Sequence, residues 1–525
     1  MKIYYYLTKS QRHRIQLERR DVYTLLFLNE QSILSQPQLY EFYSFFTNIS
    51  DAAFRRKMSR WNDANIINKR KVKMENGYEL AIIELTLAGQ SILKKLGYLN
   101  EDEKLKYQAK SNLDHTLAIK QSVIEVLRNV SDIDPFYIAD GGKYIIPFRE
   151  GDNEDELEQT AIIFKNQNFG SDFIPPFKSK YSSDDIEKFK NTGVVQSFVP
   201  QDFEHIKEHF GKGHLIDKSG LKPDWIFKVK GTFIYIEVDS GNEKIKTKRD
   251  HTNTIIEKHD VKSIEGKLYR YEQLAKSDRE HNHKVIFALM DDSDVVITKN
   301  IHSNKDIRIA NLKHEIAHMN DYNNWKIEVY VTGMKRFYTV FEAVYLELIN
   351  NIKSYTYEVY KKAFITLIKA GLKPNWKNLK FMVVAKHFYP TLGISTNNLN
   401  FIPDFLFRYY QDSEDKYEQY FIPVFIREGS VKDMERLAYY TIPTANGRFK
   451  YNAKILALYE RKEELFNDVI RKTKKVNTNK ITREIVDNNG MDIDNIVFAA
   501  IDEISNGKLL LYNANKKQID KSQLF

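Results

Sequence analysis

The segment Leu221–Asp239, LKPDWIFKVKGTFIYIEVD, decides how the middle of this chain folds. The residues after Asp224 alternate as in a β-strand, Lys230 and Gly231 supply a two-residue turn, and a second β-rich strand follows. The pattern therefore predicts a β-hairpin. Because its two strands run back on each other, Asp224 and Glu237 meet at the same end of the hairpin.

Two carboxylates held together in this way can bind a hard cation, and Mg²⁺, with Mn²⁺ as the alternative, prefers such oxygen ligands. Asp239 lies two residues beyond Glu237, so it points to the same face of the strand and is a third candidate ligand. Taken singly, Asp224 is typical of a turn and the other two acids of a solvated strand face. Taken together, they indicate a metal site that activates water beside a phosphodiester.

The composition sets wide limits on the class of protein. The chain has 525 residues, enough for roughly three domains of about 150 residues each. Hydrophobic residues make up 42% of it and the formal net charge is +9, which describes a foldable chain with a basic surplus. A surplus of this size is compatible with an anionic partner such as DNA but does not establish one.

The chain contains no cysteine, which excludes disulfides, thiolate catalysis and cysteine-ligated zinc. No run approaches the roughly 18 apolar residues of a membrane span. The segment Met1–Leu7 is too short and too rich in tyrosine for the apolar core of a signal peptide. We therefore expect a cytoplasmic protein without a membrane partner.

Residues 1–100 carry the pattern helix, helix, helix, hairpin, helix. Asp21 is expected to cap the first helix, Ser35 to begin the second and Ser50 to begin the third. A basic strand follows, and Asn76-Gly77 is typical of a type I′ turn that leads into the returning strand. The expected domain is small, and its third helix has one apolar and one basic side.

This order is typical of a winged helix-turn-helix, in which the third helix enters the major groove of DNA. Arginines on that helix are candidates for base edges, because arginine pairs bidentately with guanine, and the cations of the strand are candidates for the backbone. These candidates are Arg55, Arg56 and Arg60 on the helix, and Lys69, Arg70, Lys71 and Lys73 on the strand. The alternative is a helical domain whose charged face is simply solvated.

Residues 111–300 form the second expected domain, which contains the acidic hairpin. A mostly apolar helix with His115 near its start precedes the hairpin. Beyond the hairpin, the sequence predicts a helix that carries Lys267 and Tyr271, and then a buried strand at Lys284–Met290. Helix, acidic hairpin, helix and strand form the core order of restriction-endonuclease-like nucleases.

Together with the N-terminal module, this order resembles the replication-relaxation family. That family includes MobC-type plasmid relaxases, whose catalytic domain is related to the PD-(D/E)XK restriction endonucleases. The likeness covers roughly residues 20–300. It is carried by Pro223-Asp224, Glu237-Val238-Asp239, Lys267-Leu268 with Tyr271, and His115.

The resemblance implies DNA binding by the N-terminal module and metal-dependent cleavage of a DNA strand by the central domain. Asp224 and Glu237 match the acidic metal ligands, whereas Asp239 stands where such nucleases have a lysine. An aspartate adds a ligand but cannot stabilise a pentavalent phosphate by positive charge. We therefore expect Lys267, on the following helix, to supply that charge and complete the catalytic set.

Residues 301–460 partly repeat the central pattern. The segment FIPDFLF at 401–407 echoes LKPDWIF, and a later strand carries Pro423 and Phe425 where the hairpin has its acids. The pattern predicts a degenerate, inactive second copy that serves as scaffold, dimer surface or DNA clamp, with chance similarity as the competing interpretation. Residues 461–525 are expected to form a tail or small subdomain.

The sequence thus predicts a multidomain protein of mixed α+β and α/β class. The leading hypothesis is an endonuclease that nicks double-stranded DNA at a specific origin site for mobilisation of a plasmid or mobile element. Its expected partners are DNA, relaxosome or coupling proteins, and a second copy of the chain. The nucleophile is either a tyrosine or water. A non-catalytic regulator of replication or transcription, and a defence nuclease against invading DNA, are the alternatives.

Overall fold

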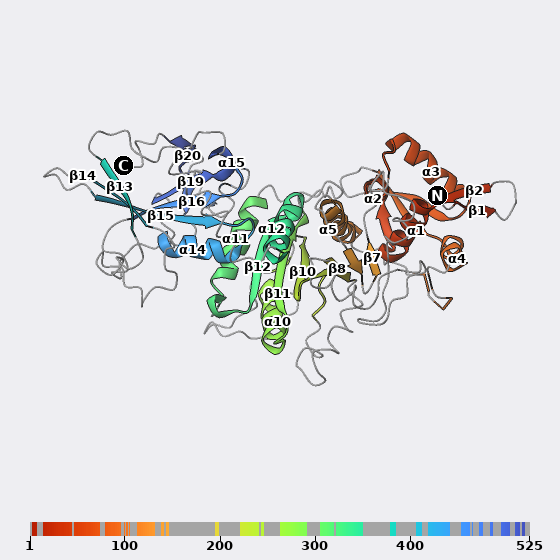
Figure 1. Ribbon diagram of the computed structural model, residues 1–525, viewed down its shortest axis with the longest axis horizontal. Helices are drawn as coiled ribbons and strands as arrows, with labels where there is room; N and C mark the ends of the chain where they lie inside the picture. The colour runs from red at the N-terminus through yellow and green to blue at the C-terminus, as the bar shows by residue number, and fades with distance from the viewer. Residues whose placement is uncertain are drawn as a thin grey trace. The chain divides into compact units, whose positions relative to one another are not determined.

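The computed structural model of the chain is a mixed α and β protein (Figure 1). It forms two compact units, Met1–Ser303 with Thr332–Ile349, and Asn304–Val331 with Asn350–Phe525. The residues that the structure describes are 3–7, 14–44, 47–73, 79–95, 99, 101–102, 104–105, 113–131, 138–140, 143–145, 195–198, 221–240, 243–245, 263–290, 305–319, 322–349, 379–384, 406–411, 418–441, 453–462, 465, 472–475, 483–486, 495–504, 510–514 and 517–519.

The first unit begins with a module of helices around a small antiparallel sheet of order β3-β5-β4, preceded by a hairpin of β1 and β2. The helices and the later hairpin follow in the order that the sequence predicts, with the short strand β3 added. Their bounds are β1 (Ile3–Leu7), β2 (Arg14–Glu18), α1 (Arg19–Gln31), β3 (Ile33–Ser35), α2 (Gln36–Ser44), α3 (Asp51–Asp63), β4 (Ile67–Lys73), β5 (Glu79–Leu85) and α4 (Leu87–Lys95).

Polar side chains set the helix starts in this module. The hydroxyl of Ser50 caps α3 by accepting a hydrogen bond from the N–H of Ala53 (3.3 Å), as expected. The expected cap at Asp21 is wrong, because α1 already begins at Arg19. Asp21 instead closes a capping box from inside the first turn, where its Oδ2 accepts from the N–H of Glu18 (3.0 Å).

The apolar side of α3 faces the core of the module. Phe54, Met58 and Trp61 are buried at helical spacing, and each such burial contributes about 1.5–3 kcal/mol. Phe27 of α1 and Phe42 of α2 stack at a centroid distance of 3.9 Å in the same core. The arginines of α3 are thereby left on its exposed side.

The first unit continues with a larger sheet whose strands follow the order β11-β10-β9-β8-β6-β7. Its central strand β10 is buried along its whole length, as expected of a strand that is covered on both faces. The strands and the helices of this part are α5 (Leu113–Ser131), β6 (Ile138–Asp140), β7 (Lys143–Ile145), β8 (Val195–Phe198), β9 (Trp225–Val229), β10 (Thr232–Asp239), α10 (Ile264–Ser277), β11 (Asn282–Leu289) and α12 (Phe337–Ile349).

The hairpin of β9 and β10 is confirmed. Lys230 (φ 43°) and Gly231 (φ 72°) both adopt positive φ, which a type I′ turn requires, and Val229 pairs with Thr232 directly beside it. After β10 the chain crosses through α10 and returns as β11, which runs parallel to β10. Parallel strands need such a crossover, so the helix order follows from the strand directions.

The second unit contains a sheet of order β13-β14-β15-β16-β19-β20-β21 and a separate pair β17-β18. The strands β14 and β15 are antiparallel, and β15 and β16 are parallel with α14 between them in the chain. The bounds are α11 (Lys305–Ala317), η3 (Tyr322–Asn324), β13 (Leu379–Val384), β14 (Leu406–Gln411), β15 (Glu418–Ile426), α14 (Val431–Thr441), β16 (Ala453–Tyr459), β17 (Lys472–Lys475), β18 (Arg483–Val486), β19 (Ile496–Ala500), α15 (Ile501–Ile504), β20 (Leu511–Tyr512) and β21 (Gln518–Ile519).

The order β14, β15, α14, β16 repeats the order and the strand directions of β9, β10, α10, β11. The chain passes back to the first unit through β12 (Ile327–Gly333) and η4 (Met334–Arg336). Within the described ranges, no helix has both the length and the apolar character that crossing a membrane requires. The expected turn at Asn76-Gly77 and the Asp404 of the repeated segment lie outside the described residues.

Candidate active site

Asp224 lies immediately before β9, at the open end of the hairpin. Its backbone N–H donates to the carbonyl of Ile236 (3.0 Å), and its Oδ2 accepts from the N–H of Val238 (2.7 Å). These two bonds fix the carboxyl group beside the last residues of β10. The sequence prediction that Asp224 and Glu237 share one end of the hairpin is therefore confirmed as geometry.

Glu237 points into the space between β10 and α10. Its carboxylate accepts two hydrogen bonds, one from the hydroxyl of Tyr271 to Oε1 (2.6 Å) and one from Nζ of Lys267 to Oε2 (3.0 Å). Lys267 and Tyr271 are four residues apart, so they lie on the same face of α10. Glu237 is only 2% exposed, which makes both contacts charge-assisted bonds in a largely dry setting.

Lys267 bridges two acids. Its Nζ also donates to Oε1 of Glu243, in the segment after β10, at 3.0 Å. Asp239, two residues beyond Glu237, is also buried at the end of β10. The ammonium group that we expected near Glu237 or Asp239 thus lies within ion-pair distance of Glu237.

His115 comes from the first turn of α5 and meets the same end of the hairpin. Its Nε2 lies 2.9 Å from the carbonyl oxygen of Val238 and 3.4 Å from Oδ2 of Asp224. Burial lowers the pKa of this imidazole, but Asp224 and the carbonyl of Val238 outweigh burial and raise it to about 9. His115 is therefore an imidazolium at neutral pH and donates from Nε2.

Charge is unevenly distributed in this site. Burial, and to a smaller extent the negative charge of Asp224, raise the pKa of Glu237. Lys267 and Tyr271 lower it, and the net result is a pKa of about 7. Burial lowers the pKa of Lys267, but Glu237 and Glu243 outweigh it and hold this pKa above its usual value. The carboxylates thus repel one another even with the lysine present, and a further cation relieves that repulsion.

The donor set fits a magnesium or manganese ion. Mg²⁺ is commonly bound by one or two carboxylates and keeps several waters, so Asp224 and Glu237 would suffice as its protein ligands. The expected third ligand, Asp239, does not join them in a group of three among the described residues. Across the described part of the chain, no three His, Asp or Glu residues are already grouped as a metal cage. A cation here would therefore replace the contacts that Lys267 and His115 make with the acids.

Two buried tyrosines lie beside the carboxylates. The rings of Tyr271 and Tyr235 lie 4.8 Å apart, and both side chains are fully buried. Burial raises the pKa of both phenols well above the usual value, and Glu237 adds to the effect at Tyr271, as Asp278 does at Tyr235. A buried phenol that keeps its proton cannot attack a phosphodiester.

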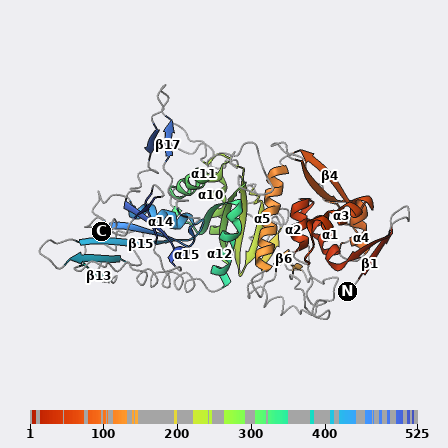
Figure 2. The ribbon, with the colours of Figure 1, turned by 90° about the horizontal axis from the view of Figure 1, so that it is seen from above.

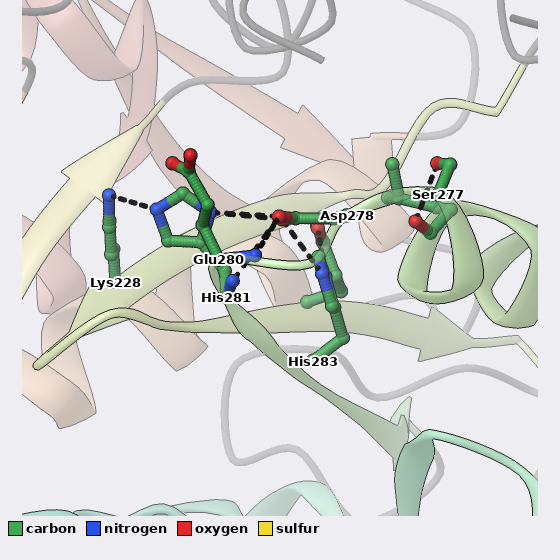
Figure 3. Close-up of polar contacts among 8 residues, drawn as sticks. Lys228, Ser277, Asp278, Glu280, His281 and His283 are labelled. Carbon is green, nitrogen blue, oxygen red and sulfur yellow. Dashed lines mark hydrogen bonds and ion pairs between the residues drawn. The ribbon is translucent and has the colours of Figure 1, made fainter.

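A second polar cluster lies at the C-terminal end of α10 (Figure 3). Oδ2 of Asp278 lies 2.9 Å from Nδ1 of His281 and 3.0 Å from Nε2 of His283. Nζ of Lys228 lies 3.2 Å from Nε2 of His281. Because an ammonium group only donates, this contact makes Nε2 the acceptor and places the proton of His281 on Nδ1, where it donates to Asp278.

The same cluster reaches the strand that carries Glu237. Nδ1 of His283 lies 3.0 Å from the hydroxyl of Tyr235, two residues before Glu237 in β10. The cluster thus ties the end of α10 to β10 and β11, and it fixes the ring against which Tyr271 packs. We assign it a supporting role, because it reaches the carboxylates only through the aromatic pair of Tyr235 and Tyr271.

The basic candidates of the N-terminal module differ in their partners. Three of them form ion pairs within the module, and exposed pairs of this kind contribute about 0–1 kcal/mol. These pairs are Arg55–Asp51 (2.7 Å), Arg70–Glu84 (3.3 Å) and Lys71–Glu79 (2.8 Å). Within the described residues, the other candidates have no acidic partner, namely Arg56, Arg60, Lys69 and Lys73.

One lysine of α3 does not belong to the exposed basic side. Lys57 turns inward, where its Nζ lies 2.6 Å from Oδ1 of the buried Asp21 and 2.8 Å from the hydroxyl of Tyr43. It also lies over the ring of Trp61 at 5.8 Å from the centroid. Its charge is therefore used inside the module, and the exposed basic side consists of the arginines.

Sequence reasoning named Tyr271 and His115 only as residues that carry the resemblance, and it did not name Glu243; the structure adds the contacts of all three with the carboxylate site. The bond from Tyr271 to Glu237 was within reach of sequence analysis, because a lysine and a tyrosine four residues apart share one helix face. Glu243 lies in an irregular segment, where no periodicity reports side-chain direction. His115 reads as an ordinary core histidine, and only the packing of α5 brings it to Asp224.

Comparison with protein-family models, with curated proteins and with solved structures finds no match to this chain. The function is therefore argued from the geometry of its own residues.

Proposed function

We propose that this chain is a DNA-binding endonuclease that uses Mg²⁺ or Mn²⁺ to nick one strand of double-stranded DNA at an origin of a plasmid or mobile element. The observation that carries the proposal is the buried carboxylate of Glu237 beside Asp224, with a lysine 3.0 Å away. Two acids that repel each other next to one ammonium group match the needs of phosphodiester hydrolysis. The origin-specific role rests on the resemblance to the replication-relaxation family.

Each residue of the site has a distinct task in this proposal. Asp224 and Glu237 would hold the metal, which when bound supplies positive charge to the phosphate and acidifies a water. Lys267 would supply positive charge to the phosphate from α10, because the strand position where such nucleases carry a lysine is occupied by Asp239. Tyr271 holds Glu237 in one orientation through its hydroxyl.

His115 has the second positive charge of the site. In the imidazolium form it donates to the carbonyl of Val238 and faces Asp224, so it orients the carboxyl that would bind metal. The two tyrosines closest to Glu237 are buried, which supports water as the nucleophile.

DNA binding is proposed for the N-terminal module. Its order of elements matches a winged helix-turn-helix, and Arg56 and Arg60 lie on the exposed side of α3 without an acidic partner among the described residues. Such arginines can read base edges in the major groove. Lys69 and Lys73 on β4 are proposed to contact the backbone, whereas Arg55, Arg70 and Lys71 would first have to leave their ion pairs.

For the second unit we propose a degenerate copy of the nuclease fold. Its support is the shared order and direction of β14, β15, α14 and β16, together with Pro423 in β15 where β10 has Glu237. Without the acid it cannot hold metal, so it would serve as scaffold or as a surface for DNA or a second copy of the chain.

The decisive experiment uses the purified full chain and a supercoiled plasmid that carries the DNA flanking the chain's own coding sequence. With Mg²⁺, we expect the plasmid to become nicked, and with EDTA to stay supercoiled. Asp224→Asn and Glu237→Gln keep the size of each side chain and should lower the nicking rate about a hundredfold or more. Glu280→Gln, which changes an exposed carboxylate after α10, is the matched control and should nick like the wild type.

Retained nicking in Asp224→Asn or Glu237→Gln would refute the assignment of these acids. An absence of nicking by the wild type with both Mg²⁺ and Mn²⁺ would refute the enzymatic proposal.

A non-catalytic DNA-binding regulator is the second candidate, favoured by one observation. Both oxygens of Glu237 already have partners, Lys267 and Tyr271, so the acid is also stable as a purely structural group. If the chain is such a regulator, its DNA footprints should persist in EDTA, and calorimetry should detect no Mn²⁺ binding to the wild type. If Mn²⁺ binds the wild type but not Asp224→Asn, this candidate is excluded.

A further inference from the structure

One helix, α5, contacts both the N-terminal module and the carboxylate hairpin. Its neighbours include α2 and β3 on the module and β10 in the larger sheet. Figure 2 shows α5 between α2 and the strands of that sheet. The contacts to the two sides come from the same stretch of the helix, between His115 and Gln121.

On the module side, the link is made by buried glutamines. Nε2 of Gln38, in α2, donates to the carbonyl of Leu117 (2.7 Å) and to Oε1 of Gln121 (3.4 Å). Nε2 of Gln121 in turn lies 3.4 Å from Oε2 of Glu41 on α2. Gln38 is fully buried and Gln121 is 7% exposed, so these bonds form away from water.

Gln38 is itself held in place at the start of α2. Its Oε1 accepts from the N–H of Ser35 (3.0 Å), while the hydroxyl of Ser35 accepts from the N–H of Gln38 (3.3 Å). This reciprocal capping box fixes the side chain before it reaches α5. The Nε2 group therefore points toward α5, where Leu117 and Gln121 accept its hydrogen bonds.

On the site side, α5 contacts the hairpin at both of its strands. His115 binds the carbonyl of Val238 in β10 and faces Asp224. One turn further along, Nζ of the buried Lys120 lies over the ring of Trp225 in β9, 4.9 Å from its centroid. The helix is thus fixed to the hairpin through the side chains of His115 and Lys120.

We propose that α5 is a rigid link that sets the distance from the bound DNA sequence to the carboxylate site, with Gln38 and Gln121 as its positioning residues. The inference rests on the proposed endonuclease function for its consequence, which is that each recognition site is cut at one position. The buried contact joins the carbonyl of Leu117 to the amides of Gln38 and Gln121, and it disfavours any other arrangement because a shifted helix breaks these bonds away from water.

Whether α5 holds the module at a fixed distance from the larger sheet can be measured without an activity assay. The chain contains no cysteine, so two can be introduced for spin labels, one at the exposed Lys95 of α4 and one at the exposed Gln273 of α10. We expect one narrow distance peak for the otherwise wild-type chain. In Gln38→Leu, the fraction of protein outside that peak should rise about tenfold, the effect of losing hydrogen bonds at one buried contact.

Gln90→Leu is the matched control, because Gln90 is a buried glutamine of the same module that lies on α4. Its distance distribution should stay as narrow as that of the wild type. If Gln38→Leu fails to fold, Gln121→Leu removes the bond between the two glutamines from the α5 side but keeps the bond from Gln38 to Leu117, so it should broaden the distribution in the same way but less. An unchanged distribution in the folded Gln38 or Gln121 variant overturns the proposal.

The cleavage consequence is read by mapping nicks at nucleotide resolution on the plasmid. Wild type and Gln90→Leu should cut at one position, and Gln38→Leu should spread its cuts over neighbouring positions at an unchanged DNA affinity. A single unchanged cut position in Gln38→Leu contradicts the link. If the wild type does not nick, the proposed function fails, and the distance distributions still decide whether α5 fixes the module.

Discussion

Replacing Lys267 by methionine tests the electrostatics of the candidate site directly. The ammonium group lies 3.0 Å from both Glu237 and Glu243, and the lysine side chain is 18% exposed. Methionine keeps much of the apolar contact of the lysine stem and removes the charge together with its hydrogen bonds to the two acids. An opposite charge this close lowers a carboxyl pKa by about 1–3 units, so we expect the pKa of Glu237 to rise from about 7 by about two further units.

The sign of the pH dependence follows from that shift. A carboxyl whose folded pKa is raised binds its proton more tightly in the native state, so stability falls as pH rises between the unfolded and the folded pKa. In the wild type this window ends near pH 7, and in Lys267→Met it extends to about pH 9. Lys267→Met should therefore cost little through Glu237 at pH 6 and about 2–3 kcal/mol near pH 9.

The assay is urea unfolding followed by tryptophan fluorescence, at pH 6 and pH 9. Lys276→Met is the control, because this lysine of the same helix is 57% exposed in its pair with Glu272 and should cost at most about 0.5 kcal/mol at either pH. In a Glu237→Gln background, the extra loss of Lys267→Met at high pH should disappear. A loss that is equal at both pH values would refute the argument, because Glu237 would then not be the group that the lysine neutralises.

Three further predictions concern other residues. Tyr271→Phe leaves one oxygen of buried Glu237 without its donor and should cost about 1–3 kcal/mol in urea unfolding, whereas a loss below that range would show that the bond is not formed. Burial raises the pKa of Asp433, but Arg427 outweighs burial and holds this pKa below its usual value. The ionised carboxylate therefore stabilises the fold above about pH 4, and this stabilisation is lost as the pH falls further. Asp433→Asn should lower the free energy of unfolding at pH 7 and match the wild type in acid. Ser50→Ala removes the cap of α3 and should lower the unfolding free energy by about 1 kcal/mol, checked by thermal unfolding against the exposed control Ser59→Ala.

Much of the first unit was predictable because its signals are local. The cap at Ser50 and the turn at Lys230-Gly231 depend on residues that are neighbours in the chain, and both are present. The start of α1 was misplaced because Asp21 suits both a cap and the third position of a capping box, and only backbone geometry separates the two. The inward turn of Lys57 was not predictable from helical periodicity, because its acidic partner Asp21 lies on another helix.

The sequence by itself determined the acidic hairpin, because strand alternation, a two-residue turn and the side chains of Asp224 and Glu237 are all written within one short segment. Only the tertiary structure decided what surrounds those acids. The crossover through α10 brings Lys267 to Glu237, and the packing of α5 brings His115 to Asp224. Contacts between residues far apart in the chain are set by which buried faces fit together, and no local period in the sequence records that fit.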